Sequence, residues 1–163
     1  MLCLLWSIIP VVGTAYSGYT TRSNSLAAVM PEILVVIVCS IQWFILGYTL
    51  AYGEGKNIFG DFQYVFHENV LAEPVSTITV VLFSFFQLVF QTNVWAIALG
   101  EACERGRLLS LVPFIFLWSP FVYDPSAHMV RGGDFLVELG VLDFADGTPL
   151  HINSEATATT MSV

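Results

Sequence analysis

Long stretches without charged side chains alternate with short polar segments along this chain. The uncharged runs extend from Met1 to Thr21, Ile33 to Gly53, Val75 to Gly100 and Leu108 to Tyr123. A helix needs about 20 apolar residues to cross the hydrocarbon core of a bilayer. The first three runs meet this length, and the fourth reaches it by extending toward Ala127. We therefore predict membrane-spanning helices near residues 2–20, 27–52, 77–101 and 108–127.

A fifth helix is predicted near residues 148–163. Thr148 suits the position that caps a helix, and Pro149 suits the first helical position. This helix falls short of a full span if Glu155 lies inside it. Its last residues, EATATTMSV, are small and polar, which is typical of a surface where membrane helices approach each other closely.

The first run has an alternative interpretation as a secretory signal peptide. It has no basic residues before its apolar part, and it contains Pro10, Gly13 and Gly18. These features are atypical of a signal peptide, so a membrane span is favoured.

The composition is that of a membrane protein. Of the 163 residues, 56% are hydrophobic and only 11% are charged, whereas soluble domains have about 25% charged residues. The chain has 13 acidic against 5 basic side chains. A nucleic-acid-binding protein needs a basic surface, so we expect the lipid bilayer to be the surroundings and no nucleic acid to be a partner.

The cysteines do not form a recognisable metal or disulfide pattern. Cys3, Cys39 and Cys103 lie in or beside apolar runs, and no C-x-x-C motif or His/Cys cluster is present. Free cysteine is among the most buried residue types. We expect buried thiols, no metal and no cofactor.

The basic residues predict a topology. Arg22, Arg105 and Arg107 share one side of the membrane if the helices alternate in direction, and Lys56 and Arg131 lie on the other side. The positive-inside rule then places the first group in the cytoplasm and the N-terminus outside. An odd number of spans leaves the C-terminus inside.

Four stretches carry a resemblance to a known family: IQWFILGYTLAYGEG (41–55), FQLVFQTNVWAIALGEACERGR (86–107), VYDPSAHMV (122–130) and LDFADGTPLHINS (142–154). Their order and spacing resemble the ammonium transporter family, which includes the methylammonium permeases and the Rhesus glycoproteins. The segments NVLAEP, ACERGRLL and GTPLHI are most similar to the fungal permeases.

The resemblance implies an all-α polytopic membrane protein. The family fold has eleven helices, built from two inverted halves of five helices and one further helix. Residues 1–163 would be a single transmembrane domain that corresponds to the first inverted repeat. The family also implies ammonium or methylammonium as substrate, a plasma-membrane location, and a trimer formed with like chains or with other ammonium transporter chains.

The same resemblance identifies four candidate pore residues. His151 resembles the first of two pore histidines, which hydrogen-bond ammonia or relay a proton. The alternative is a histidine satisfied within the core. Phe86 and Phe90 share one helix face and match two family phenylalanines, of which Phe90 would gate the outer mouth. The alternative for both rings is a core or lipid-facing position. Asp143 matches a near-invariant aspartate that orders the outer vestibule, where the first N–H groups of a helix favour an acid.

Three positions depart from the family pattern. Arg131 stands where the family has a tryptophan that stacks on ammonium at the recruitment site, so we expect it to repel a cation. Asp146 replaces the second glycine of an Ala-Gly-Gly turn, and a side chain there is expected to clash. Glu155 lies one helical turn after His151, where it could pair with a protonated imidazole or block a narrow pore.

Two functional hypotheses follow. The first is ammonium transport, with ammonium recruited outside, deprotonated, and passed as ammonia beyond His151; we expect this half-length chain not to transport alone. The alternative is a non-conducting or regulatory subunit, or degenerate fragment, that associates with full-length ammonium transporters. An intramembrane enzyme is not favoured, because Asp143 and His151 are accompanied by no nucleophile or metal set.

Overall fold

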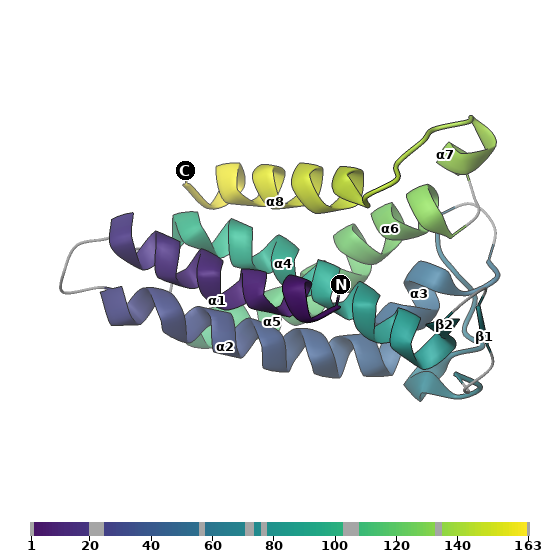
Figure 1. Cartoon of the computed structure of the whole chain (residues 1–163), viewed down its shortest axis with the longest axis horizontal. Helices are drawn as coiled ribbons and strands as arrows, with labels where there is room; N and C mark the ends of the chain where they lie inside the picture. The colour runs from purple at the N-terminus through teal and green to yellow at the C-terminus, as the bar shows by residue number, and fades with distance from the viewer. Residues whose placement is uncertain are drawn as a thin grey trace.

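The computed structural model describes residues 2–19, 25–55, 58–70, 74–75, 78–102, 108–132 and 135–162. These residues form a bundle of long helices that run along its longest axis, with short elements gathered at one end (Figure 1). The all-α architecture agrees with the expectation from the uncharged runs.

The first two long helices form an antiparallel pair. α1 (Leu2–Tyr19) packs against α2 (Ser25–Gln42), which continues through the π-helical turn η1 (Trp43–Gly47) into α3 (Tyr48–Tyr52). Of the described residues, three helical stretches are long and apolar enough to cross a membrane: Leu2–Tyr19, Val29–Tyr52 and Val80–Gly100. Their bounds overlap the first three predicted spans, and that they cross a membrane stays a prediction.

α4 (Val80–Ala102) is the central helix of the bundle and packs against α1, α2 and α8. Most apolar side chains in its second half are buried, and even the large ring of Trp95 is 0% exposed, whereas Val81, Leu82 and Phe85 near its start are about half exposed. The indole Nε1 of Trp95 donates to the Ser119 hydroxyl at 3.3 Å. This bond ties α4 to the next long helix, which consists of α5 (Leu108–Trp118), the π-helical turn η3 (Ser119–Tyr123) and α6 (Asp124–Arg131).

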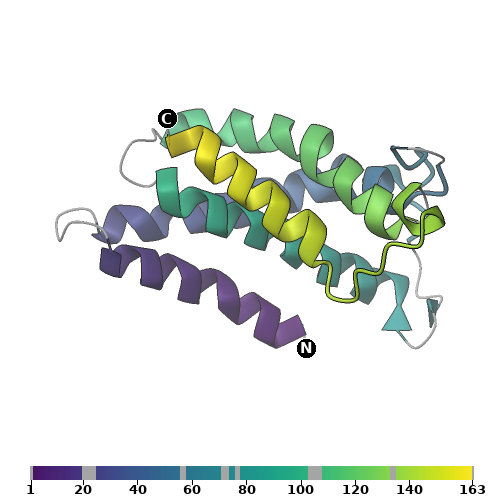
Figure 2. The same cartoon turned by 90° about the horizontal axis from the view of Figure 1, so that it is seen from above.

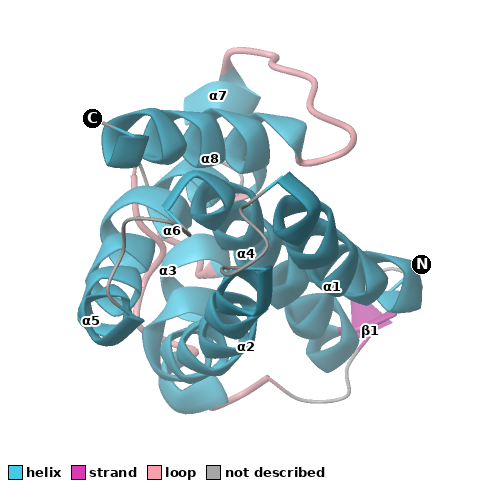
Figure 3. Cartoon of the chain, turned by 90° about the vertical axis from the view of Figure 1, so that its left-hand side faces the viewer, coloured by secondary structure: helices cyan, strands magenta, loops and turns pink. Residues whose placement is uncertain are grey.

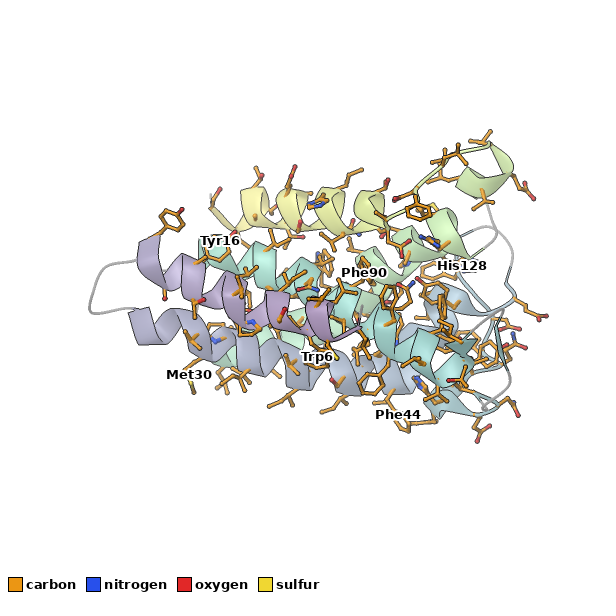
Figure 4. All side chains as sticks on the ribbon, in the orientation of Figure 1. Trp6, Tyr16, Met30, Phe44, Phe90 and His128 are labelled. Carbon is orange, nitrogen blue, oxygen red and sulfur yellow. The ribbon has the colours of Figure 1, made fainter. Side chains whose placement is uncertain are left out.

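One face of α2 and of the η1 turn that continues it is apolar and open. Met30, Ile33, Ile37, Ile41 and Phe44 follow each other at spacings of three or four, which places them on one side of the helix, and each is about half exposed. Figure 4 shows Met30 and Phe44 along the outer edge of the bundle, with Phe90 in its interior. An apolar stripe of this length suits contact with lipid tails.

Short elements lie at the end of the bundle where α4 begins. They are η2 (Val65–His67), the antiparallel strands β1 (Pro74–Val75) and β2 (Ile78–Thr79), and α7 (Phe135–Glu138). The loop after α3 folds back closely, because the Gly60 amide donates to the Leu50 carbonyl at 2.8 Å. A Cβ at Gly60 would lie only 2.2 Å from the Thr49 carbonyl oxygen, so the turn requires glycine.

α8 (Gly147–Ser162) crosses the bundle on top of α4 (Figure 2). Seen nearly end-on, α8 lies above the bundle, with α1 and α5 on opposite sides (Figure 3). The helix begins one residue before Thr148, so Thr148 and Pro149 are its second and third residues, and the predicted cap at Thr148 is wrong. Its 16 residues reach about 24 Å, less than the roughly 30 Å of the bilayer core.

The cysteines behave differently from one another. Cys39 is a buried free thiol in α2, as predicted, whereas Cys3 is a free thiol exposed on α1. The prediction of a buried thiol is therefore wrong for Cys3. Cys103 lies outside the described residues.

Candidate functional site

Asp143 organises the start of α8. Its two carboxylate oxygens accept the backbone N–H groups of Gly147 at 3.1 Å and of Thr148 at 2.7 Å. Partial burial would raise the pKa of this carboxyl, but the hydrogen bonds from Thr148, Gly147 and Ala145 outweigh burial and hold the pKa below its ordinary value. Asp143 therefore keeps a negative charge at neutral pH, and it satisfies N–H groups that a helix start leaves without partners.

Arg131 and Asp146, two of the departures from the family pattern, bind each other. The Arg131 guanidinium forms an ion pair through Nε with the Asp146 carboxylate, and its Nη2 donates to the Phe144 carbonyl at 2.8 Å. A carboxylate thus balances the guanidinium charge, and the expectation that Arg131 repels a cation stays a prediction. The pair connects the end of α6 to the loop before α8.

Asp146 adopts a backbone conformation that favours glycine. Its φ is 53°, in the left-handed region that aspartate tolerates better than most residues. The expected clash does not occur, because the side chain turns inward, is only 4% exposed, and accepts a hydrogen bond from the Gln87 amide at 3.2 Å. Gln87 belongs to α4, so the loop before α8 is tied to the central helix.

An open cleft of about 560 Å³ lies beside this network. Arg131, Asp143 and Phe144 line it, together with apolar residues of α6, of α7 and of the segment that follows α7. The structure therefore brings two of the predicted site residues, Arg131 and Asp143, to one concave surface at the end of the bundle.

Phe86 and Phe90 pack against each other on α4. Their ring centroids are 5.1 Å apart at an interplanar angle of 62°, an edge-to-face arrangement that aromatic pairs favour. Phe90 is buried in the core, whereas Phe86 is partly exposed. Gln87, the residue after Phe86, makes the hydrogen bond to Asp146.

His151 lies apart from these groups. It is one turn into α8, and its side chain is exposed on the outside of the bundle, as is that of Glu155. Among the described residues, no hydrogen bond or ring contact joins His151 to Phe86, Phe90 or Asp143, and no ion pair joins it to Glu155. The alternative of a satisfied core histidine does not describe His151, which is open to its surroundings.

Two polar networks, the first of them fully buried, could not be predicted from the sequence. Gln91 donates to Gln42 at 2.7 Å, and Gln42 donates to Asp124 at 2.8 Å, which joins α4, α2 and α6. All three side chains are at most 1% exposed. The sequence did hold one indication of the first network: Asp124 lies in the fourth predicted span, and a carboxyl group within a membrane helix usually has a specific partner or role.

The second network involves His67, which lies in the loop region after α3. Its Nε2 is 2.8 Å from the Ser84 hydroxyl, which also accepts the Trp43 indole N–H at 3.1 Å. Burial lowers the pKa of His67 and outweighs the opposing effect of its hydrogen bond with the Phe44 carbonyl. Within the described part of the chain, no group of His, Cys, Asp or Glu side chains is arranged to hold a metal ion.

Comparison with known proteins identifies the family. A family model described as the Ammonium Transporter Family matches residues 1–162. The chain is 36% identical to ammonium transporter MEP2 of Saccharomyces cerevisiae over 92% of its length and 31% of the relative's. It is also 36% identical to an ammonium transporter of Bacillus subtilis, over 93% of this chain and 38% of that protein.

Solved structures agree with this assignment. The crystal structure of Candida albicans Mep2 superposes with a TM-score of 0.85 at 36% identity, covering 97% of this chain and 36% of that one. The structure of Saccharomyces cerevisiae Mep2 gives a TM-score of 0.84 at 33% identity, covering 97% of this chain and 37% of that one.

The chain spans roughly a third of the length of the curated relatives, and its fold matches 37–42% of the length of two solved Mep2 structures. From its sequence and from its fold, this chain belongs to the ammonium transporter family.

Proposed function

We propose that this chain provides one wall of an ammonium-conducting path across the plasma membrane and does not conduct alone. The observation that carries the proposal is the open face of α8. His151, Glu155 and Thr159 follow at four-residue spacing on this face, and all three are exposed. Polar and ionisable side chains at membrane depth rarely face lipid. Such a face therefore favours contact with water or with another protein segment.

The proposed path begins at the cleft beside Asp143. The fixed negative charge of Asp143 favours the approach of a cation such as ammonium or methylammonium. Phe86 and Phe90 would form the constriction below it, where an aromatic face also attracts a cation. His151 would then exchange hydrogen bonds with ammonia or carry the released proton, because imidazole both donates and accepts and titrates near neutral pH.

The open face of α8 also supports a second candidate function. A non-conducting subunit would use the same exposed residues to associate with a full-length ammonium transporter chain, within a homo- or heterotrimer. The two functions predict different results. A chain that forms part of a conducting path supports ammonium uptake by the cell, whereas a non-conducting subunit lowers the ammonium uptake of the transporter with which it associates.

The experiment is uptake of radiolabelled methylammonium by yeast cells that lack their own ammonium transporters. One strain expresses this chain alone, and a second expresses it joined to the part of Saccharomyces cerevisiae MEP2 that follows the matched region. A third carries His151→Ala in the joined protein. Thr160→Ala is the matched control, because Thr160 is exposed on the same helix, its hydroxyl donates to the Ala156 carbonyl, and it lies about half a turn around the helix from His151.

We expect no uptake from the chain alone, clear uptake from the joined protein, and a loss of about tenfold or more with His151→Ala but not with Thr160→Ala. Uptake by the chain alone would overturn the claim that it needs a second wall. A joined protein that reaches the membrane but takes up nothing would overturn the conducting role. Reduced uptake when the chain is co-expressed with full-length MEP2 would support the non-conducting subunit instead.

A further inference from the structure

The guanidinium of Arg131 is held by acceptors that come from one short segment, the loop before α8. The ion pair with Asp146 uses Nε, and the 2.8 Å bond to the Phe144 carbonyl uses Nη2. The Arg131 side chain remains 36% exposed, whereas the Asp146 side chain is 5% exposed. The positive partner thus reaches from the surface into a site whose negative partner is buried.

The acceptors are fixed without help from Arg131. One carboxylate oxygen of Asp146 accepts from the Gln87 amide of α4 at 3.2 Å. Asp143, three residues earlier, holds the same loop by accepting the N–H groups of Gly147 and Thr148. The backbone at Asp146 is set in a left-handed conformation. These constraints come from α4 and α8, so the site is preorganised when Arg131 is removed.

The acceptor set selects a type of ligand. A buried carboxylate without a cation is costly, and a carboxylate beside a carbonyl offers oxygen acceptors to a donor with several N–H groups. Calcium prefers six to eight oxygen ligands, and magnesium needs near-ideal octahedral coordination, so two protein groups suit neither. A small organic cation such as guanidinium, ammonium or methylammonium matches the set.

We propose that Asp146 and the Phe144 carbonyl form a cation site that Arg131 occupies as a tethered ligand, and that the site takes a small free ammonium or guanidinium ion when Arg131 is absent. The site does not depend on transport. If the proposed function holds, Arg131 competes with incoming ammonium at the outer cleft. A tethered group acts at an effective concentration of about millimolar or more, so dilute free cations do not displace it.

The test is chemical rescue of Arg131→Ala in the purified chain, followed by thermal unfolding in detergent at constant ionic strength. Guanidinium chloride is added in the low millimolar range, far below denaturing concentrations, and ammonium and methylammonium chloride are added separately. Urea is the uncharged control of the same shape as guanidinium, and sodium chloride controls for salt. Arg131→Met is a second variant that keeps the apolar stem and removes the charge.

We expect the unfolding midpoint of Arg131→Ala to lie below that of the unsubstituted chain and to rise by a few degrees, saturably, with guanidinium, as ligand binding to the folded state requires. The unsubstituted chain should show no saturable rise, and neither should Arg131→Ala combined with Asp146→Asn. A rise that is equal in the double variant, or equal with sodium or urea, would overturn the proposal. If Arg131→Ala does not fold, binding of labelled methylammonium to Arg131→Met is measured by equilibrium dialysis. We expect binding that is lost when Asp146→Asn is added. No binding, or equal binding with and without Asp146→Asn, would overturn the proposal.

Because the readout is binding and stability, this result is independent of uptake. A chain that binds the cation but conducts nothing in any combination would refute the proposed function and leave the cation site intact.

Discussion

The side-chain amide of Gln42 donates to the Asp124 carboxyl at 2.8 Å, although the two residues are 82 positions apart in sequence. The bond joins α2 to α6 inside the bundle, and Gln91 of α4 completes the connection by donating to Gln42 at 2.7 Å. Three helices that share an apolar core are thus fixed in register by one polar chain.

The first prediction concerns the hydrogen bonds that join Gln91, Gln42 and Asp124. Gln42→Leu leaves the Asp124 carboxyl without its described donor and removes the acceptor for Gln91. We expect a loss of about 1–3 kcal/mol in the free energy of unfolding, which is the usual cost of a buried polar group that loses its partner. Replacing both Gln42 and Asp124 with leucine should cost less than Gln42→Leu alone, because the carboxyl that loses its donor is then also removed. Thermal unfolding of the purified chain measures both, and a double variant that is less stable than the single one would contradict the argument.

The second prediction concerns the cap formed by Asp143. Asp143→Ala should destabilise the chain by about 0.5–2 kcal/mol, whereas Asp143→Asn should lose less, because asparagine also caps helices well. The folded-state pKa of Asp143 is lowered from its ordinary value of 3.8. The cap is therefore fully present above that value and is lost as the pH falls through the folded-state pKa.

The measurement is the unfolding midpoint of the chain and of Asp143→Asn between about pH 6 and pH 3. The difference between the two proteins should shrink as the pH falls. A difference that is constant over this range would show that the charge of Asp143 does not contribute.

The third prediction concerns His67, whose pKa is lowered in the folded chain because the ring is half-buried. The neutral ring is the form that folding favours, so its contribution is full above the ordinary value of 6.5 and is lost as the pH falls through the folded-state pKa. Replacing His67 with glutamine should reduce the loss of stability between about pH 7 and pH 5. Identical pH profiles for the two proteins would rule out this role for the ring.

The fourth prediction compares two glycines. Gly60→Ala should destabilise the chain severely, because its Cβ would lie 2.2 Å from the Thr49 carbonyl oxygen and 2.8 Å from the Gly53 nitrogen, which are backbone atoms. Gly18→Ala is the control, since a Cβ there meets nothing within 4 Å and alanine is the better helix former. Yield of folded protein and unfolding midpoint are the readouts, and equal behaviour of the two variants would disprove the close approach at Gly60.

The long helices could be predicted from the sequence because the bilayer imposes a simple rule. Charge-free runs of sufficient length predict α1, α2 and α4, and these helices are present at nearly the predicted positions. The start of α8 was assigned less accurately. Thr148 and Pro149 have the residue types of a helix start, but Asp143 and Asp146 compete for the same role, and the side chain of Asp143 satisfies the free N–H groups.

The candidate site was less predictable because its key relationship is tertiary. Arg131 and Asp146 each look unfavourable when considered alone, one by charge and the other by backbone conformation. Their pairing depends on a left-handed turn at Asp146 and on the distance between α6 and the loop before α8, which no local pattern specifies. The exposure of His151 likewise follows from which face of α8 packs on α4, and a helix with little amphipathic character leaves that choice open.

The two π-helical turns flank the Gln42–Asp124 bond: η1 begins directly after Gln42, and η3 ends directly before Asp124. A π turn holds one residue more than an α-helical turn needs, so each is equivalent to a single inserted residue. Deleting one residue within Trp43–Gly47 would remove this surplus residue and leave Tyr48 in register on an ordinary α-helix, whereas deleting one residue within α2 would rotate the residues before it by about 100° relative to those after it. For these helices the number of residues, as much as their kind, is under structural constraint.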